Sequence, residues 1–189
     1  LTYRCLNQDP DFGPKIARRY LTWVNFSRSG RPLILLIGGT AASGKSTIAT
    51  ALAGRLDIIR TQSTDMLREV MRMMIPERLL PILHTSSFDA WKTLPLRDSE
   101  DADLDQLVAE GYRGQADLVK VPCEAVLKRA VKERVPIIME GIHAQPDLLS
   151  SAREDSDVIT VYVMLAVLKS KKIKSRLRGR GTDVPRRKP

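Results

Sequence analysis

The stretch Gly39-Thr40-Ala41-Ala42-Ser43-Gly44-Lys45-Ser46 lies between the apolar run 33–37 and a helical pattern over 47–56. It matches G-x-x-x-x-G-K-[ST] at every defined position. Gly39 and Gly44 let the backbone turn so that successive N–H groups point inward, and the positive end of the following helix adds to their field. A strand, a glycine loop and a helix in this order predict a phosphate-binding loop, rather than a chance turn capped by Ser43.

The loop predicts that the chain binds a nucleoside triphosphate. Lys45 can reach the β- and γ-phosphates, and the Ser46 hydroxyl can occupy one position on a bound Mg²⁺. ATP and Mg²⁺ are therefore the expected cofactors. The residues expected to bind them are Gly39, Thr40, Ala41, Ala42, Ser43, Gly44, Lys45, Ser46 and Thr47.

Composition and charge narrow the class of protein. The 189 residues are 43% hydrophobic and 28% charged, as in a globular domain with a real core. The formal net charge is +9, and the excess lies entirely in residues 169–189, where Asp183 is the only acid. This distribution argues against a broad basic face for nucleic acid and for a local anion-handling element. With no apolar stretch near the roughly 20 residues that cross a bilayer and no signal-peptide pattern, we expect a cytoplasmic protein without a membrane partner.

Apolar runs alternate with helical patterns along the chain. The expected strands are 33–37, 57–61, 136–140 and 158–165. The expected helices are 14–24, 47–56, 66–72, a second short piece over 75–83, and 104–133, the last broken or kinked at Gly111 and Pro122. Apolar strands that alternate with helices imply a parallel sheet covered on both faces. The predicted fold class is therefore α/β, a three-layer P-loop NTPase fold.

Polar residues follow the predicted strands at the edge where such sheets bind ligands. Asp65 could orient or deprotonate an acceptor hydroxyl, and Arg68 could grip an anionic group of the acceptor; their plainer roles are a helix N-cap and a surface residue. Glu140 ends the third strand, where an acid near the metal or a simple turn cap is expected. His143 could bind a substrate phosphate or carboxylate, or be an ordinary loop histidine.

The basic segment after the fourth strand predicts a lid over the phosphates. Arginine near a transferring phosphoryl group stabilises the charge on its oxygens, so Arg176 and Arg180 are candidate catalytic residues. A solvated basic helix, or a nucleic-acid contact, is the alternative. The lid candidates are Lys169, Lys172, Arg176, Arg178 and Arg180.

Three stretches together resemble the 2-phosphoglycerate kinase family of P-loop kinases. They are 37–47, 63–72 and 140–143, with further similarity at 79–87 and 90–92. The resemblance runs from about Arg31 to Leu165. It implies ATP-dependent phosphorylation of the 3-hydroxyl of 2-phosphoglycerate to give 2,3-bisphosphoglycerate, and a further strand with an adenine-contacting loop after the lid. Plant proteins linked to inositol phosphate metabolism are also similar to this family.

These observations lead to a hypothesis with two alternatives. We expect an N-terminal helical extension over 1–30 and a P-loop kinase domain over 31–189 with an incomplete C-terminal part. The expected function is a small-molecule kinase for a small anionic phosphorylated substrate. The alternatives are an ATP-binding regulatory module, related to inositol phosphates, and a polynucleotide kinase; few aromatic residues lie near the basic segment to stack on bases, which ranks the last lowest.

Overall fold

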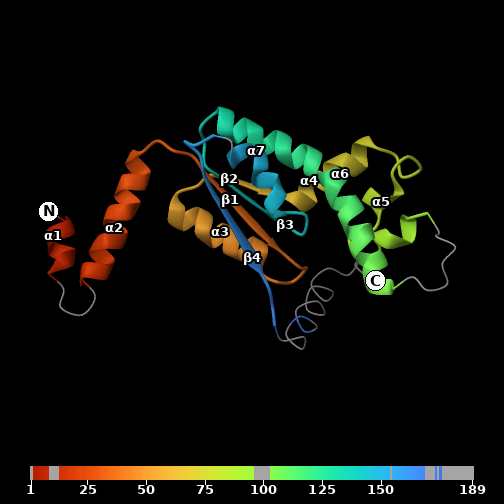
Figure 1. The fold of residues 1–189 in the computed structure, drawn as a ribbon, viewed down its shortest axis with the longest axis horizontal. Helices are drawn as coiled ribbons and strands as arrows, with labels where there is room; N and C mark the ends of the chain where they lie inside the picture. Colours follow the sequence, from red (N-terminus) through yellow and green to blue (C-terminus); the bar gives the residue numbers. More distant parts are fainter. Residues whose placement is uncertain are drawn as a thin grey trace.

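Four parallel strands form the centre of the molecule. The computed structural model describes residues 2–8, 13–95, 103–153, 155–168, 173 and 175. The strands are β1 (Leu33–Gly39), β2 (Arg60–Ser63), β3 (Ile137–Gly141) and β4 (Ile159–Leu165), in the order β2-β3-β1-β4 (Figure 1). β1 pairs in parallel with β3 and β4 and is buried along its whole length, because both faces of the sheet are covered.

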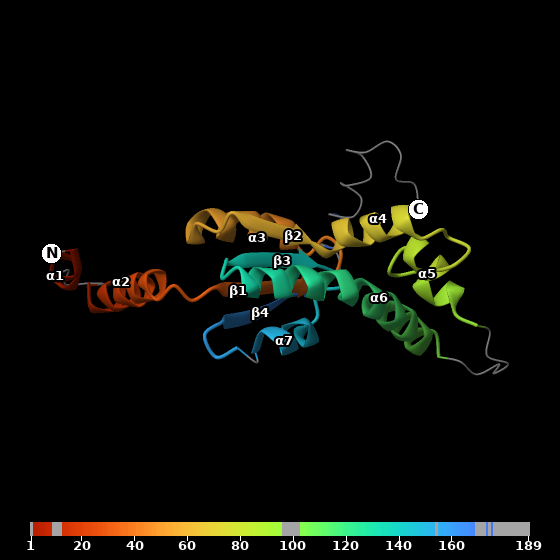
Figure 2. The same ribbon diagram turned by 90° about the horizontal axis from the view of Figure 1, so that it is seen from above.

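Helices cover the two faces, and alternate residues of β1 face different helices. Leu35 and Ile37 pack in one apolar cluster with Ala49 of α3 (Lys45–Leu56). Ile34 and Leu36 pack in another with residues of α6 (Leu104–Lys132) and α7 (Ser150–Arg153). Figure 2 shows α3 and α7 on opposite sides of the strands, with α6 crossing in front of them. The structure therefore confirms the α/β fold class.

Shorter elements surround the carboxyl ends of the strands. α4 (Thr64–Met74) begins directly after β2, where the Ser63 hydroxyl accepts a hydrogen bond from the Asp65 N–H at 3.2 Å. α5 (Pro81–His84) and the 3₁₀ turn η1 (Ala90–Thr93) pack near α6, and the 3₁₀ turn η2 (Pro146–Leu149) leads into α7. Of these pieces, α4 carries two of the predicted site residues, Asp65 and Arg68.

Two predicted boundaries were wrong. β2 begins at Arg60, because Asp57 takes a left-handed conformation that ends α3 and Ile58 binds back to the Ala53 carbonyl. The helical piece expected over 75–83 is confined to α5, which begins at Pro81 and ends at His84. α6 runs unbroken from Leu104 to Lys132, and Figure 1 shows it bent, as expected where Pro122 cannot donate a helical hydrogen bond.

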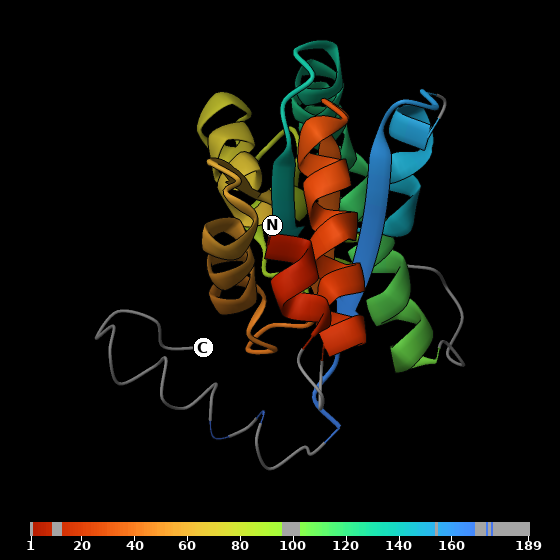
Figure 3. The same cartoon turned by 90° about the vertical axis from the view of Figure 1, so that its left-hand side faces the viewer.

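A helical hairpin projects from the end of the sheet opposite the glycine loop. It consists of α1 (Thr2–Asn7) and α2 (Gly13–Arg28), which lie beside each other in front of the strands in Figure 3. Phe26, near the end of α2, packs against the apolar cluster on the α3 side of the sheet. Among the described residues, no helix combines the length and the hydrophobicity that a bilayer crossing requires.

Candidate nucleotide and acceptor site

The glycine loop joins β1 to α3 through three residues with left-handed φ angles. Gly39 has φ +141°, Ala42 +62° and Gly44 +97°. A Cβ atom at Gly39 would overlap the Leu165 carbonyl of β4, so this position requires glycine for close approach as well as for its conformation. The loop therefore lies tightly against the end of the sheet with the start of α3 directly behind it.

Two polar side chains of the loop are almost fully buried. The Lys45 ammonium donates a hydrogen bond of 2.9 Å to the Thr40 carbonyl across the loop. The Ser43 hydroxyl is buried, and its oxygen has no hydrogen-bond partner. A buried hydroxyl without a partner is costly, and a phosphate oxygen in the loop would supply one. The residues present therefore fit a bound triphosphate.

Ser46 and Glu140 meet beside the loop. The Ser46 hydroxyl donates a hydrogen bond of 3.0 Å to the Glu140 carboxylate, because the register of β1 with β3 places Glu140 opposite Ile37. A hydroxyl and a carboxylate are hard oxygen ligands of the kind Mg²⁺ takes alongside substrate phosphates. The described residues contain no cluster of three or more His, Cys, Asp or Glu side chains suited to a metal. The donor set therefore fits Mg²⁺ held jointly with phosphate oxygens.

Asp65 stands at the first turn of α4, with its carboxylate about half-exposed. Its neighbour Thr64 is completely buried against Gly141, where a Cβ atom would overlap the threonine hydroxyl. This contact fixes the start of α4 against the end of β3. Asp65 is consequently held at the edge of the sheet predicted from the sequence.

Arg68 lies one turn further along α4 and is largely buried. One guanidinium nitrogen, Nη1, donates to the Thr85 carbonyl at 3.1 Å and lies 3.4 Å from the Gln115 side-chain oxygen. Nη2 is 3.7 Å from the Glu69 carboxylate, and Nε is buried without a hydrogen-bond partner. Protein groups thus already occupy part of the Arg68 guanidinium, which was predicted from the sequence to bind an anionic group of the acceptor.

His143 is 2% exposed and lies beneath this cluster. Its Nε2 is 2.9 Å from the Gln115 side-chain oxygen and 3.3 Å from the Ser87 hydroxyl, and its ring stacks parallel to Tyr112. Nδ1 is 3.9 Å from the Asp65 carboxylate and has no hydrogen bond. Burial lowers the pKa of His143 to about 4; the Asp65 carboxylate opposes this shift, and Arg68 and Lys45 lower the pKa further by smaller amounts. The imidazole is therefore neutral at physiological pH.

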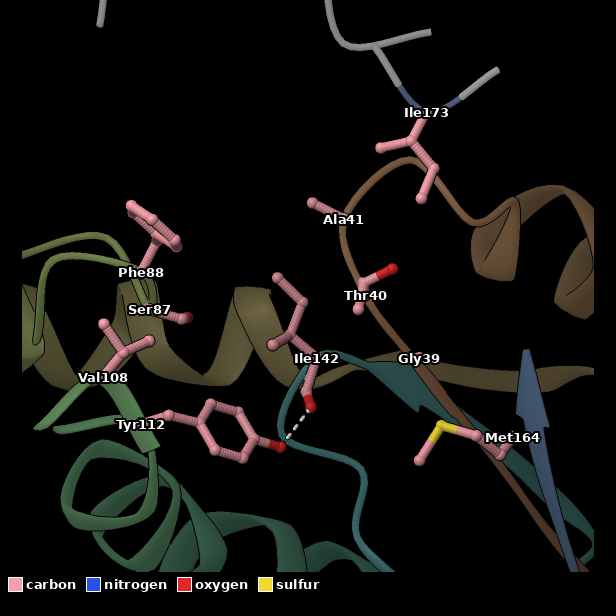
Figure 4. Close-up of a pocket in the computed structure, with 10 residues that line it drawn as sticks. All are labelled: Gly39, Thr40, Ala41, Ser87, Phe88, Val108, Tyr112, Ile142, Met164 and Ile173. Carbon is pink, nitrogen blue, oxygen red and sulfur yellow. Dashed lines mark hydrogen bonds between the residues drawn. The ribbon is translucent and has the colours of Figure 1, made fainter. Parts of the chain in front are cut away.

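A cavity of about 600 Å³ opens beside the glycine loop (Figure 4). Tyr112 closes one wall, and its hydroxyl donates to the Ile142 carbonyl at 2.8 Å. The lining is mostly apolar and consists of Gly39, Thr40, Ala41, Ser87, Phe88, Val108, Tyr112, Ile142, Met164 and Ile173. Of these lining residues, only Gly39, Thr40 and Ala41 were predicted from the sequence to belong to the site. Phe88, Tyr112 and Ile142 carry no local signal, because only the packing of α6 against the loops after α5 and β3 brings them together.

The predicted lid cannot be placed in this site. Lys169, Lys172, Arg176, Arg178 and Arg180 all lie outside the described residues. Ile173, which is described, lines the cavity. The structure thus brings together Lys45, Ser46, Asp65, Glu140 and His143 at the carboxyl edge of the sheet, as the sequence predicted, with Arg68 behind them.

The strand order, the parallel sheet and the glycine loop define a P-loop nucleotide-binding fold. No model of a known protein family matches the chain. The chain is 39% identical over 150 residues to the 2-phosphoglycerate kinase of Pyrococcus horikoshii, covering 79% of this chain and 47% of that protein. It is 41% identical over 150 residues to that of Pyrococcus furiosus, with the same coverage. It is 36% identical over 175 residues to that of Methanopyrus kandleri, covering 92% of this chain and 51% of that protein.

These similarities confirm the resemblance to the 2-phosphoglycerate kinases, and the names of the relatives favour neither alternative function. The chain spans about half the length of the curated relatives it matches. Among solved structures, a protein from Chloroflexus aurantiacus aligns with a TM-score of 0.41 and 16% identity over 84% of this chain and 71% of its own.

Proposed function

We propose that this protein is an ATP-dependent kinase that transfers the γ-phosphoryl group to a hydroxyl of a phosphorylated acid. The substrate we favour is 2-phosphoglycerate, which would yield 2,3-bisphosphoglycerate. The observation that carries the proposal is the arrangement around one loop: Ser46 and Glu140 meet at it, and Asp65 with His143 lies at the same edge of the sheet. The curated relatives named 2-phosphoglycerate kinase support this choice of acceptor. A cytoplasmic location stays part of the proposal, because ATP is supplied inside the cell.

On the nucleotide side, the backbone of residues 39–47 would hold the triphosphate, and Lys45 would contact its terminal phosphates. The buried Ser43 hydroxyl without a partner supports this placement. Ser46 and Glu140 would hold Mg²⁺, which when bound neutralises negative charge on the phosphate oxygens. Arg176 and Arg180 remain our candidates for stabilising the transferring group from the lid.

On the acceptor side, Asp65 would orient the attacking hydroxyl. The hydroxyl oxygen forms a bond to the γ-phosphorus, the bond from that phosphorus to ADP breaks, and the hydroxyl proton leaves to Asp65 or to solvent. Arg68 and His143 would contact the acceptor beside it. The apolar lining of the cavity limits access of water, which would otherwise compete as the acceptor.

The test is ADP release from Mg·ATP by the purified 189-residue chain. The acceptors to compare are 2-phosphoglycerate, 3-phosphoglycerate, glycerate, inositol phosphates and an RNA with a 5′-hydroxyl end. We expect stimulation by 2-phosphoglycerate, loss of that stimulation in Lys45→Ala, and a phosphorus NMR spectrum of the product that matches 2,3-bisphosphoglycerate. ATP binding without stimulation by any acceptor would contradict the proposal.

A further inference from the structure

Gln115 is a fully buried amide in the middle of α6 whose orientation is set by its neighbours. Its Nε2 donates hydrogen bonds to the Ile82 carbonyl at 2.5 Å and to the Thr85 carbonyl at 3.2 Å. Carbonyl oxygens accept hydrogen bonds and cannot donate them, so the NH₂ group must face them. The Gln115 oxygen therefore faces the other way, toward His143 and Arg68.

This orientation decides which nitrogen of His143 carries the proton. The Gln115 oxygen is 2.9 Å from Nε2 and can only accept, so Nε2 is the protonated nitrogen. A neutral imidazole then has its lone pair on Nδ1. That atom is buried, has no hydrogen-bond partner, and faces the Asp65 carboxylate at 3.9 Å. Two acceptor atoms thus face each other with no donor between them.

We propose that Gln115 is a positioning residue: it holds His143 as the neutral Nε2–H tautomer, so that Nδ1 and the Asp65 carboxylate both face, and share, the single hydroxyl proton at the alcohol end of the acceptor. The inference rests on the proposed function. It deepens that function because the sequence predicted either a contact for phosphate or carboxylate at His143 or an ordinary loop histidine. A lone pair repels those groups and attracts a hydroxyl, so the anionic end of the acceptor binds elsewhere in the site.

The competing Nδ1–H tautomer of His143 shows why a residue is needed that holds the proton on Nε2. With the proton on Nδ1, His143 would point an N–H toward the Asp65 carboxylate 3.9 Å away, and the two groups would attract each other without substrate. The Gln115 oxygen opposes this state, because it would then face a ring nitrogen that cannot donate and would keep only the longer contact from Arg68 Nη1. A second proton on the ring is favoured by Asp65 but opposed by burial, which is the largest effect, and by the positive charges of Arg68 and Lys45; the remaining titratable group against the ring is Tyr112.

The direct test is NMR of the chain labelled with ¹⁵N in its histidine rings. The chain contains two histidines, His84 and His143, so a His84→Gln variant assigns both sets of signals. At pH 7.5 we expect His143 to be neutral with its proton on Nε2. An imidazolium, or a neutral ring protonated on Nδ1, would overturn the proposal without any variant of Gln115.

The second arm compares Gln115→Met with Gln106→Met, a change of the same type at an exposed position on the same helix. Loss of the Gln115 oxygen should move the His143 proton to Nδ1, whereas Gln106→Met should leave the ring signals as in the wild type. Gln115→Met should also lower kcat about tenfold or more, within the range for losing a positioned proton acceptor, with little change in KM for ATP. An unchanged tautomer in a folded Gln115→Met variant would refute the positioning role.

The third arm adds 2-phosphoglycerate and a non-hydrolysable ATP analogue to the labelled wild type. Binding should shift the Nδ1 resonance more than the Nε2 resonance. Saturable binding that leaves the Nδ1 resonance unchanged would show that the alcohol end of the acceptor does not bind beside Nδ1 of His143. Failure of the proposed kinase reaction is distinguishable, since it would appear as absent turnover with the Nε2–H tautomer and its dependence on Gln115 intact.

Discussion

Lys45 and His143 are almost fully buried, whereas the Asp65 carboxylate beside them stays about half-exposed. Buried polar atoms are stabilised only by specific partners, so each has a fixed direction. Lys45 bridges the loop to the Thr40 carbonyl, and the Nε2 of His143 faces Gln115. The exposed carboxylate is free to meet a substrate from solvent. Burial thus fixes the orientation of Lys45 and His143, whereas the Asp65 carboxylate remains able to reorient toward a substrate.

Lys45→Ala should lower kcat by roughly 10²–10³-fold, because it removes a preorganised donor to the transferring phosphate. ADP release under saturating acceptor measures the loss. Lys128→Ala is the matched control, since Lys128 is an exposed lysine of α6 that pairs with Glu124 on the surface. Equal activity of Lys45→Ala and the wild type would remove the lysine from the phosphate site.

The lowered pKa of His143 predicts a loss of stability in acid. Its pKa is about 4 in the folded chain against an ordinary value of 6.5, so below pH 6.5 the unfolded chain binds a proton that the folded chain does not. The free energy of unfolding should fall by about 2 kcal/mol between pH 7 and pH 5 from this group alone. Urea unfolding at constant ionic strength measures the slope, and His143→Asn should flatten it. The same slope in both proteins would show that the pKa is not depressed.

The elements of the site are held by close backbone contacts as much as by side chains. α4 starts where it does because Ser63 caps it and because Thr64 packs directly on Gly141 of β3. Asp65 lies in the first turn of that helix. A change in this contact should therefore alter both stability and the position of the carboxylate.

Gly141→Ala should destabilise the chain by about 3 kcal/mol, because its Cβ would overlap the Thr64 hydroxyl at a φ of +155°. Gly54→Ala is the comparison: Gly54 lies within α3 with nothing within 4 Å of an added Cβ, so alanine should stabilise the helix by roughly 0.5–1 kcal/mol. Urea unfolding measures both. Similar effects of the two substitutions would contradict the close packing of α4 on β3.

At the scale of the whole molecule, the carboxyl ends of parallel strands gather the site at one edge of the sheet, and the α1–α2 hairpin lies at the other. Phe26 links the hairpin to the core, while Ile16 and Trp23 of α2 remain partly exposed. The extent of the N-terminal extension over 1–30 stays a prediction. Because α1 and α2 project away from the sheet in Figure 1, the prediction can be tested by removing most of this hairpin.

Removal of residues 1–24 should leave a chain that folds cooperatively, with its free energy of unfolding lowered by less than about 1 kcal/mol, because little apolar surface of the sheet is covered by the removed part. Trp91 remains as the fluorescent reporter after loss of Trp23. Nucleotide binding should be unchanged. A shortened chain that is unfolded, or that no longer binds ATP, would show that the hairpin belongs to the same folding unit.

The glycine loop, the α/β class and the positions of Asp65 and Glu140 at strand ends could all be predicted from the sequence. Each follows from a local pattern, since the loop is a run of consecutive residues and β1, β3 and β4 are apolar runs. β2 shows the limit of this reasoning. Its residues, 60–63, are polar and partly exposed at the edge of the sheet, whereas the apolar Ile58 and Ile59 before it lie outside the strand.

The contacts around His143 and Arg68, on the acceptor side of the site, could not be predicted from the sequence. Gln115 lies 28 residues from His143 and 47 from Arg68, and no periodicity links a helix amide to a loop histidine. The packing of α6 against the segment after α5 buries the amide and fixes its orientation, and this orientation settles the protonation of His143. Local patterns specify elements, but the direction of a buried hydrogen bond depends on residues that only the fold brings together.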